Sequence, residues 1–136
     1  MMKSMRQSYV PVSRGSIEGG IIALAMLTAM VHLLLAFGNG LPMGKFPILF
    51  LLNGIGYLVL LVALYLPSLA KFQPLVRWVL IAYAALTVVV WFLVTQASYD
   101  PLDYTVKLAE LSLIVLLCVE AFYQRTSQKA QASQRQ

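Results

Sequence analysis

Four polar residues interrupt otherwise apolar stretches of this sequence: His32, Asn53, Lys107 and Glu110. A charged group at the centre of a membrane helix costs about 2.5–3.5 kcal/mol on insertion scales, so such a residue needs a partner or a wet cavity. The chemistry open to a histidine, a carboxylate and an amine in that setting is proton binding, ion pairing and hydrogen bonding to a ligand.

The spacing of these residues predicts that they meet. Lys107 and Glu110 stand three residues apart, so they share one face of a helix and can pair. At about 1.5 Å per helical residue, all four lie within about 5–10 Å of the same, outer boundary of the hydrocarbon layer. We therefore expect one intramembrane polar cluster, with His32 near Glu110. Interhelical hydrogen bonding alone accounts for such residues, and a ligand, proton or partner site is the alternative.

The other reactive groups form no recognisable catalytic, cofactor or metal motif. The single cysteine, Cys118, cannot make an internal disulfide or a CxxC redox pair, so we expect it to pack as a small apolar residue. His32 is the one histidine, whereas a haem in a helix bundle commonly takes two axial ligands. Nothing matches GxSxG, HExxH or a phosphate loop. We expect no enzyme activity and no cofactor, and we expect Glu18 and Glu120 to be solvated.

Four apolar segments must position these residues, and they span about 17–37, 47–66, 78–97 and 104–123. In hydrocarbon every backbone polar group needs an internal partner, and runs this long without alternation fit helices rather than barrel strands. Short links rich in turn residues separate them, including a loop over 67–77, and Asp103 or Thr105 is expected to cap the last helix. The sequence predicts an all-α, up-down-up-down four-helix transmembrane bundle over 17–123. A polar basic tail (1–16) and a disordered polar tail (124–136) flank it.

The composition supports a lipid environment. The chain has 136 residues, of which 60% are hydrophobic and 11% charged, whereas about a quarter of a soluble domain is charged. The net charge of +5 does not form a nucleic-acid-binding stripe, because the basic residues cluster at the termini and in one loop. We therefore expect the lipid bilayer, and no nucleic acid, as a partner.

The distribution of basic residues predicts the orientation. With four spans, eight basic residues share one side, against Lys45 and Lys107 on the other. Since cytoplasmic loops carry the excess of Lys and Arg, we expect a multi-pass protein of the cell (plasma) membrane with both termini in the cytoplasm. The eight are Lys3, Arg6, Arg14, Lys71, Arg77, Arg125, Lys129 and Arg135.

Small residues suggest where helices approach closely. Gly15, Gly19 and Ala23 form one row at four-residue spacing, and Ala25 with Ala29 forms another. Such rows permit close contact within one chain or between chains. Gly56, on the same face as Asn53, would allow the same.

The run FLLNGIGYLVLLVALYLP (50–67), with His32 before it and Lys107 and Glu110 in the last segment, resembles small uncharacterised four-helix membrane proteins of bacteria and archaea. The resemblance covers most of residues 17–123. It implies four spans and no established activity.

Two functions follow as expectations. The first is a non-catalytic membrane protein, either an accessory or assembly subunit of a membrane-protein partner or a self-associating bundle forming a homo-oligomer, with an outer-leaflet polar cluster. The second is a small proton-coupled transporter or exchanger that uses Glu110 and His32. Small multidrug exporters have similar length, but their essential carboxylate lies in the first helix, whereas Glu110 lies in the fourth.

Overall fold

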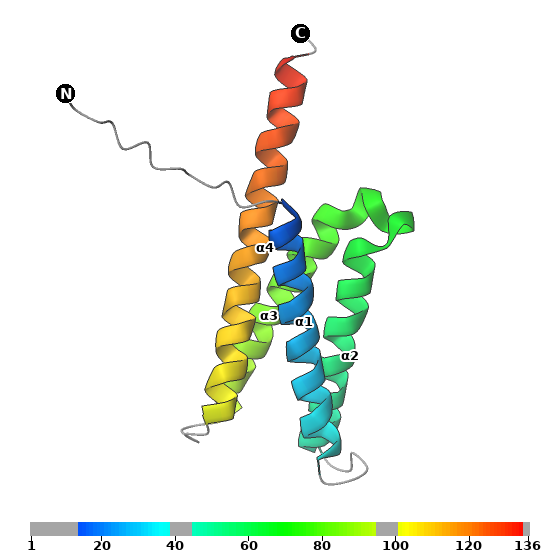
Figure 1. Ribbon diagram of the computed structural model, residues 1–136. Coiled ribbons are helices and arrows are strands. Elements are labelled where there is room, and N and C mark those ends of the chain that lie inside the picture. The colour runs from blue at the N-terminus through cyan, green and yellow to red at the C-terminus, as the bar shows by residue number, and fades with distance from the viewer. Residues whose placement is uncertain (1–13, 39–44, 95–100, 135–136) are drawn as a thin grey trace, which may run out of the picture.

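The computed structural model describes residues 14–38, 45–94 and 101–134, which form four α-helices and one short 3-10 helix. The α-helices are α1 (Arg14–Phe37), α2 (Lys45–Tyr65), α3 (Gln73–Val94) and α4 (Pro101–Ser133), and η1 (Pro67–Phe72) joins α2 to α3. Figure 1 shows the α-helices packed lengthwise, with successive helices running in opposite directions. The predicted all-α four-helix bundle is confirmed, and the described ranges contain no strand.

The core is built from positions that recur at helical spacing. On α1 the buried positions follow each other every four residues, which places them on one helix face. The other helices add the matching apolar side chains. The buried set is Ile17, Ile21, Ala25, Ala29, Tyr57, Leu61, Leu64, Leu80, Ala84, Leu113 and Leu117.

Polarity is reversed relative to a water-soluble domain. Large apolar side chains cover the outside, among them Leu34, Leu52, Val62, Leu93, Leu108 and Phe122. The buried polar and charged residues are Thr28, His32, Arg77, Lys107, Glu110 and Glu120. Soluble proteins seldom bury ionisable residues or expose so much contiguous apolar surface. This distribution is typical of helices whose outer face contacts lipid.

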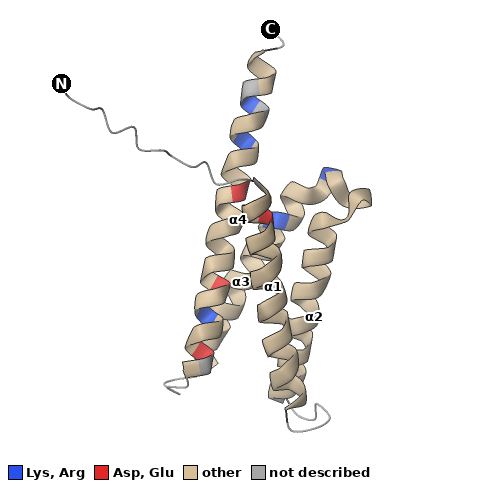
Figure 2. Ribbon diagram, viewed as in Figure 1, with Lys and Arg blue, Asp and Glu red and all other residues tan. Residues whose placement is uncertain are grey.

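Three helical segments among the described residues are long and apolar enough to cross a membrane, judged by length and composition: Gly15–Phe37, Phe46–Tyr65 and Pro67–Val94. α4 is not one of them. It differs because Lys107, Glu110 and Glu120 interrupt its apolar stretch. Figure 2 shows two groups of charged residues on α4, one near the start of the helix and one where it leaves the bundle.

The link between the second and third helices is more ordered than the sequence predicted. Residues 67–77 were expected to be a loop, but η1 fills 67–72 and α3 begins at Gln73 rather than 78. Pro74 permits this start, because a proline in the first turn of a helix loses no intrahelical hydrogen bond. The predicted end of this span, 95–97, lies outside the described residues.

The amino-terminal boundary also differs slightly. α1 begins at Arg14, inside the predicted tail, and the rest of that tail (1–13) lies outside the described residues. At the start of α4, Asp103 and Thr105 are not caps, because the helix already begins at Pro101. The Thr105 hydroxyl instead donates to the Pro101 carbonyl at 2.9 Å.

The prediction of a disordered tail from 124 is wrong over most of its length, because α4 continues unbroken to Ser133. Residues 124–133 contain no Gly or Pro, and Gln, Ala, Lys and Arg are good helix formers. A helix already nucleated inside the bundle extends at little cost through such a sequence. This extension, residues 124–133, projects beyond the other helices in Figure 1.

The two rows of small residues have different environments. Ala25 and Ala29 are buried, and α2 comes so close there that a Cβ on Gly54 would lie 3.0 Å from the Ala29 carbonyl oxygen. Gly15 and Gly19, in contrast, have open space around them, with nothing within 4 Å of an added Cβ. One row therefore joins helices of this chain, while the other faces outward.

Candidate functional site

Glu110 lies at the centre of the polar cluster and has no solvent exposure. Lys107 Nζ donates to its Oε2 at 2.5 Å, as their three-residue spacing on α4 allows. Tyr57 of α2 donates to Oε1 at 3.3 Å, and His32 Nε2 of α1 lies 3.8 Å from that same oxygen. One carboxylate thus links three helices.

A backbone carbonyl one turn earlier on α1 fixes the tautomer of His32. Its Nδ1 lies 2.8 Å from the carbonyl oxygen of Thr28, one turn earlier on α1. Because a carbonyl can only accept, Nδ1 carries the proton, and in a neutral ring Nε2 is then a lone-pair acceptor. That lone pair faces Glu110 Oε1. A proton bound to either His32 Nε2 or Glu110 Oε1 would make the contact between these two atoms attractive.

Tyr57 extends the cluster to α3. Its hydroxyl lies 3.1 Å from Thr87 Oγ1, and Thr87 donates its own proton to the Ala84 carbonyl at 2.8 Å. The Tyr57 proton is therefore available to Thr87 Oγ1 and to Glu110. These hydrogen bonds join α2, α3 and α4, and His32 of α1 lies beside them at 3.8 Å from Glu110.

Tyr57 and Thr87 were not among the residues predicted to form the polar cluster. Tyr57 lies in the middle of its span, whereas interfacial tyrosines lie near helix ends. This position is the one sequence feature that could have indicated that its hydroxyl belongs to the cluster. Which partner a mid-span hydroxyl meets depends on the rotation of each helix, and a sequence pattern does not fix that rotation.

Asn53 takes part differently from the other three predicted residues. Its backbone carbonyl accepts from the Tyr83 hydroxyl at 3.3 Å, and the residue is part of the lining of a cavity. Among the residues the structure describes, it makes no bond to Glu110. Gly56 provides the expected close approach, since an added Cβ there would overlap the Tyr83 hydroxyl.

A cavity of about 330 Å³ lies between α2 and α3, next to the polar cluster. Apolar side chains from α2 and α3 form its walls, and many are half exposed, as are Leu52 and Leu86. His32 and Lys107, both nearly inaccessible to solvent, form its deep end. The cavity therefore joins the apolar outside of the bundle to its polar interior.

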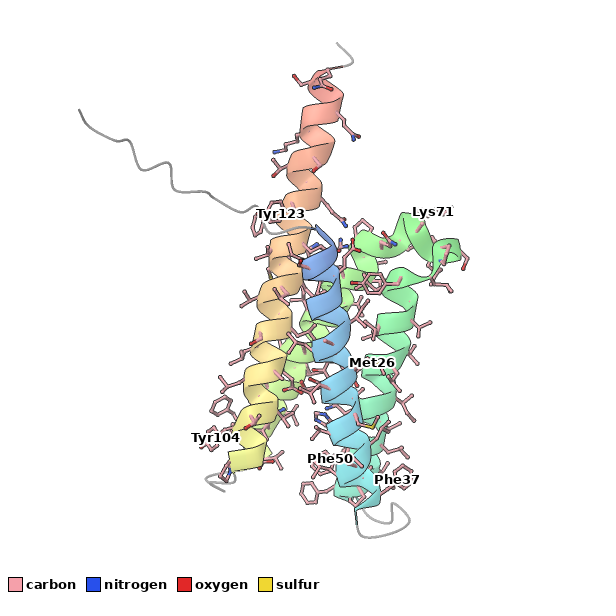
Figure 3. All side chains as sticks on the ribbon, in the orientation of Figure 1. Met26, Phe37, Phe50, Lys71, Tyr104 and Tyr123 are labelled. Carbon is pink, nitrogen blue, oxygen red and sulfur yellow. The ribbon has the colours of Figure 1, made fainter. Side chains whose placement is uncertain are left out.

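Aromatic rings hold the deep end of this cavity in place. The His32 ring packs 6.0 Å from Phe50 and 6.1 Å from Tyr57 between centroids. Lys107 Nζ lies 6.0 Å from the centre of the Trp91 ring, within reach of a cation–π interaction. Figure 3 marks Phe50 in the half of the bundle that lies away from the carboxyl terminus.

A second ionic cluster lies at the opposite end of the bundle. Arg77 of α3 donates through Nε to Glu120 Oε2 at 2.9 Å, and through Nη1 to Gln124 Oε1 at 2.9 Å. Both members of the ion pair are only 3% exposed. Glu120 was expected to be solvated, and that expectation is wrong, because the guanidinium replaces its water. Arg77 and Glu120 are far apart along the chain, so no sequence spacing predicts this pairing.

The two clusters can bind protons and accept or donate hydrogen bonds. Cys118 is partly buried, as expected for a packing residue. No group of three or more His, Cys, Asp or Glu able to hold a metal ion occurs among the described residues.

No protein-family model, curated protein or solved structure matches this chain.

Proposed function

We propose that this chain is a non-catalytic four-span membrane protein that holds a lipophilic molecule with one polar group in the cavity between α2 and α3. The observation that carries the proposal is the cavity itself, with apolar walls and a deep end formed by His32 and Lys107. Ligand pockets are commonly about 300–1,000 Å³, mostly apolar, with a few placed polar groups. This cavity has that size and composition.

Support for α4 as the fourth span comes from where its charges lie. Lys107 pairs with Glu110, and Glu120 with Arg77, so the charges that interrupt its apolar stretch are buried in pairs. The outward face of α4 carries Leu108, Leu111, Val115 and Phe122. Tyr104 and Tyr123 lie towards opposite ends of this part of the helix (Figure 3), where interfacial aromatics are expected. With four spans, the excess of basic residues puts both termini in the cytoplasm of a plasma-membrane protein.

The polar groups at the deep end favour a ligand with a neutral, hydrogen-bonding head. Glu110 already neutralises the Lys107 cation, so the site offers little net charge to an ionic ligand. The Lys107 ammonium has three N–H donors, of which Glu110 takes one, so a donor remains for an oxygen atom of the ligand. Because the half-exposed rim belongs to the apolar surface of the bundle, such a molecule would enter from the lipid.

Fluorescence quenching tests the binding site. The chain has two tryptophans, so Trp78→Phe leaves Trp91, which lines the cavity, as the one emitter. In lipid nanodiscs, a dibrominated long-chain alcohol should quench Trp91 saturably at low mole fraction. Val90→Phe narrows the cavity and should remove the saturable phase, whereas Leu93→Phe, on a fully lipid-facing position, should keep it. Quenching that rises linearly and equally in all three proteins would reject the site.

A small proton-coupled transporter or exchanger is the second candidate, and the fixed His32 tautomer beside Glu110 favours it. A proton shared at this contact could couple to a ligand in the adjoining cavity. In proteoliposomes with an imposed pH gradient, wild type should take up or release lipophilic cations faster than Glu110→Gln. Identical traces would remove this candidate without affecting the binding proposal.

An accessory or self-associating role is compatible with the same site. The outward-facing row of Gly15, Gly19 and Ala23 supports it, because small residues let a second helix approach closely. Intact-complex mass spectrometry of the protein in native-lipid particles would show a homo-oligomer or a foreign subunit. A monomer without partners would remove this role.

A further inference from the structure

A second, smaller cavity lies at the end of the bundle where α3 begins and the α4 extension leaves. Its volume is about 120 Å³. Since this is well below the roughly 300–1,000 Å³ of a pocket that encloses a whole ligand, it fits a small group only. Its lining comes from two helices: Pro74, Arg77 and Trp78 of α3, and Ala121, Gln124 and Arg125 of α4.

Arg77 lines this cavity and has more N–H donors than the described residues are seen to accept from. A guanidinium has five N–H donors in a rigid fork. Among the described residues, Glu120 takes the Nε donor and Gln124 takes one Nη1 donor. These bonds hold the side chain in one orientation, nearly inaccessible to solvent, while it lines the cavity. The remaining Nη donors belong to a group that is already oriented, so little side-chain freedom is lost when a ligand binds.

Arg125 adds a second guanidinium at the rim. Its side chain is exposed, and its Cζ lies 5.9 Å from the centre of the Trp78 ring. The lining thus combines two guanidinium groups, while the one carboxylate bonded to it, Glu120, neutralises only one of them. The charged residues of the lining itself, Arg77 and Arg125, are both basic, so the lining favours an anion.

We propose that this cavity binds the phosphate of an anionic phospholipid headgroup. Guanidinium groups recognise phosphate oxygens through paired N–H donors. Trp78 is 47% exposed, and an exposed indole beside a basic residue is typical of the headgroup level of a membrane. Apolar side chains on the same two helices, including Leu75, Val79 and Phe122, are exposed where acyl chains would lie. Basic pockets between membrane helices bind phosphorylated headgroups in this way.

The test is native mass spectrometry of the full chain, delipidated in detergent and titrated with phosphatidylglycerol. Wild type should bind one lipid above a non-specific background set by diacylglycerol, which lacks the phosphate. Arg125→Gln should weaken that binding about fivefold, or about 1 kcal/mol. Lys129→Gln is the matched control, because Lys129 is exposed one turn further along α4 and its loss changes the net charge equally. It should leave the affinity unchanged.

Arg77→Lys provides a second variant that keeps the charge beside Glu120. It removes the forked donors and should also weaken phosphatidylglycerol binding, with the bundle still folded by circular dichroism. Equal binding by wild type and Arg125→Gln, or equal weakening by Lys129→Gln, would overturn the site. Inorganic phosphate binding as tightly as the lipid would overturn the headgroup assignment and leave a soluble phosphate as the ligand.

Discussion

At Glu110, one carboxylate without solvent exposure accepts from Lys107 and Tyr57 and faces the lone pair of His32. Replacing the whole Lys107–Glu110 ion pair and removing only one of its partners should have different effects on stability. A buried ion pair contributes little net stability when it replaces well-packed apolar groups, because both charges lose their hydration. Removing one partner alone leaves the other charge buried and unpaired, which costs about 3–5 kcal/mol. Lys107 and Glu110 can therefore be buried together, but neither charge can be buried alone without a large loss of stability.

This asymmetry gives a residue-scale prediction for Glu110→Gln. We expect it to lower the unfolding free energy by about 3–5 kcal/mol, because the Lys107 ammonium then has no counter-ion. The double variant Lys107→Met with Glu110→Gln should regain most of that loss. Unfolding in detergent micelles by a denaturing detergent, followed by circular dichroism, measures both. Additive effects of the two single changes would show that the pair is not coupled.

Residue types and spacing predicted part of this site. The three-residue spacing of Lys107 and Glu110 required a shared helix face, and the similar depth of His32 suggested contact with them. The sequence could not predict that Tyr57 and Thr87 belong to the polar cluster, because the partners of a hydroxyl depend on how each helix is rotated about its axis. The pairing of Arg77 with Glu120 was missed because both stand near span ends, where solvation is the ordinary outcome.

At the scale of elements, glycine and alanine set how closely α1 and α2 approach. Ala29 is buried, and Gly54 presents only backbone towards it. A Cβ at Gly54 would lie 2.8 Å from Leu33 Cγ and 3.0 Å from the Ala29 carbonyl oxygen, tighter than ordinary contact. The sequence indicated that small residues would form such contacts, but not which row would be used inside the chain.

Gly54→Ala should therefore destabilise the bundle by about 1–3 kcal/mol, the usual cost of overpacking a well-packed site. Gly19→Ala is the matched control, since the same change there meets open space. That control should be neutral or gain up to about 1 kcal/mol from better helix propensity. Thermal unfolding of the two variants in one detergent compares them. Equal destabilisation would contradict the close approach.

The extension of α4 is a second element-scale feature, and its side chains described after 124 are exposed. Ser127→Pro should break the helix there, because proline removes a hydrogen bond and clashes with the preceding turn. Amide hydrogen exchange should quicken in 127–133 and stay slow at core positions such as Ile21 and Leu113. Unchanged exchange in 127–133 would mean that this segment is not helical in solution.

At the scale of the whole molecule, basic residues are concentrated at one end of the bundle. Apart from Lys107 near the start of α4, the basic residues of η1, α3 and α4 lie towards the end from which the α4 extension projects (Figure 2). Length and apolar composition predicted all four helices, because sustained apolar runs bounded by turn residues are strong signals. They did not predict the helical extension, whose polar composition matched both a disordered tail and a solvated helix.

The proposed orientation is testable through labelling from outside the cell. In a Cys118→Ser background, Gln131→Cys should react with a membrane-impermeant maleimide only after the cells are opened, because the α4 extension would lie in the cytoplasm. Lys107→Cys would be buried, so it is not a suitable opposite probe. Phe46→Cys, at the exposed start of α2, serves instead and should react in intact cells. The reverse pattern would invert the proposed topology.

The unbroken continuation of α4 has a mechanical consequence. Ten residues of helix at about 1.5 Å each form an arm of about 15 Å whose azimuth is locked to the part of α4 that carries Lys107 and Glu110. A twist of about 100° per residue is preserved along the whole rod, so any rotation at the buried pair is transmitted to the free end. A rigid spin label on that arm would therefore change its position when α4 rotates inside the bundle, and the rotation could be measured outside it.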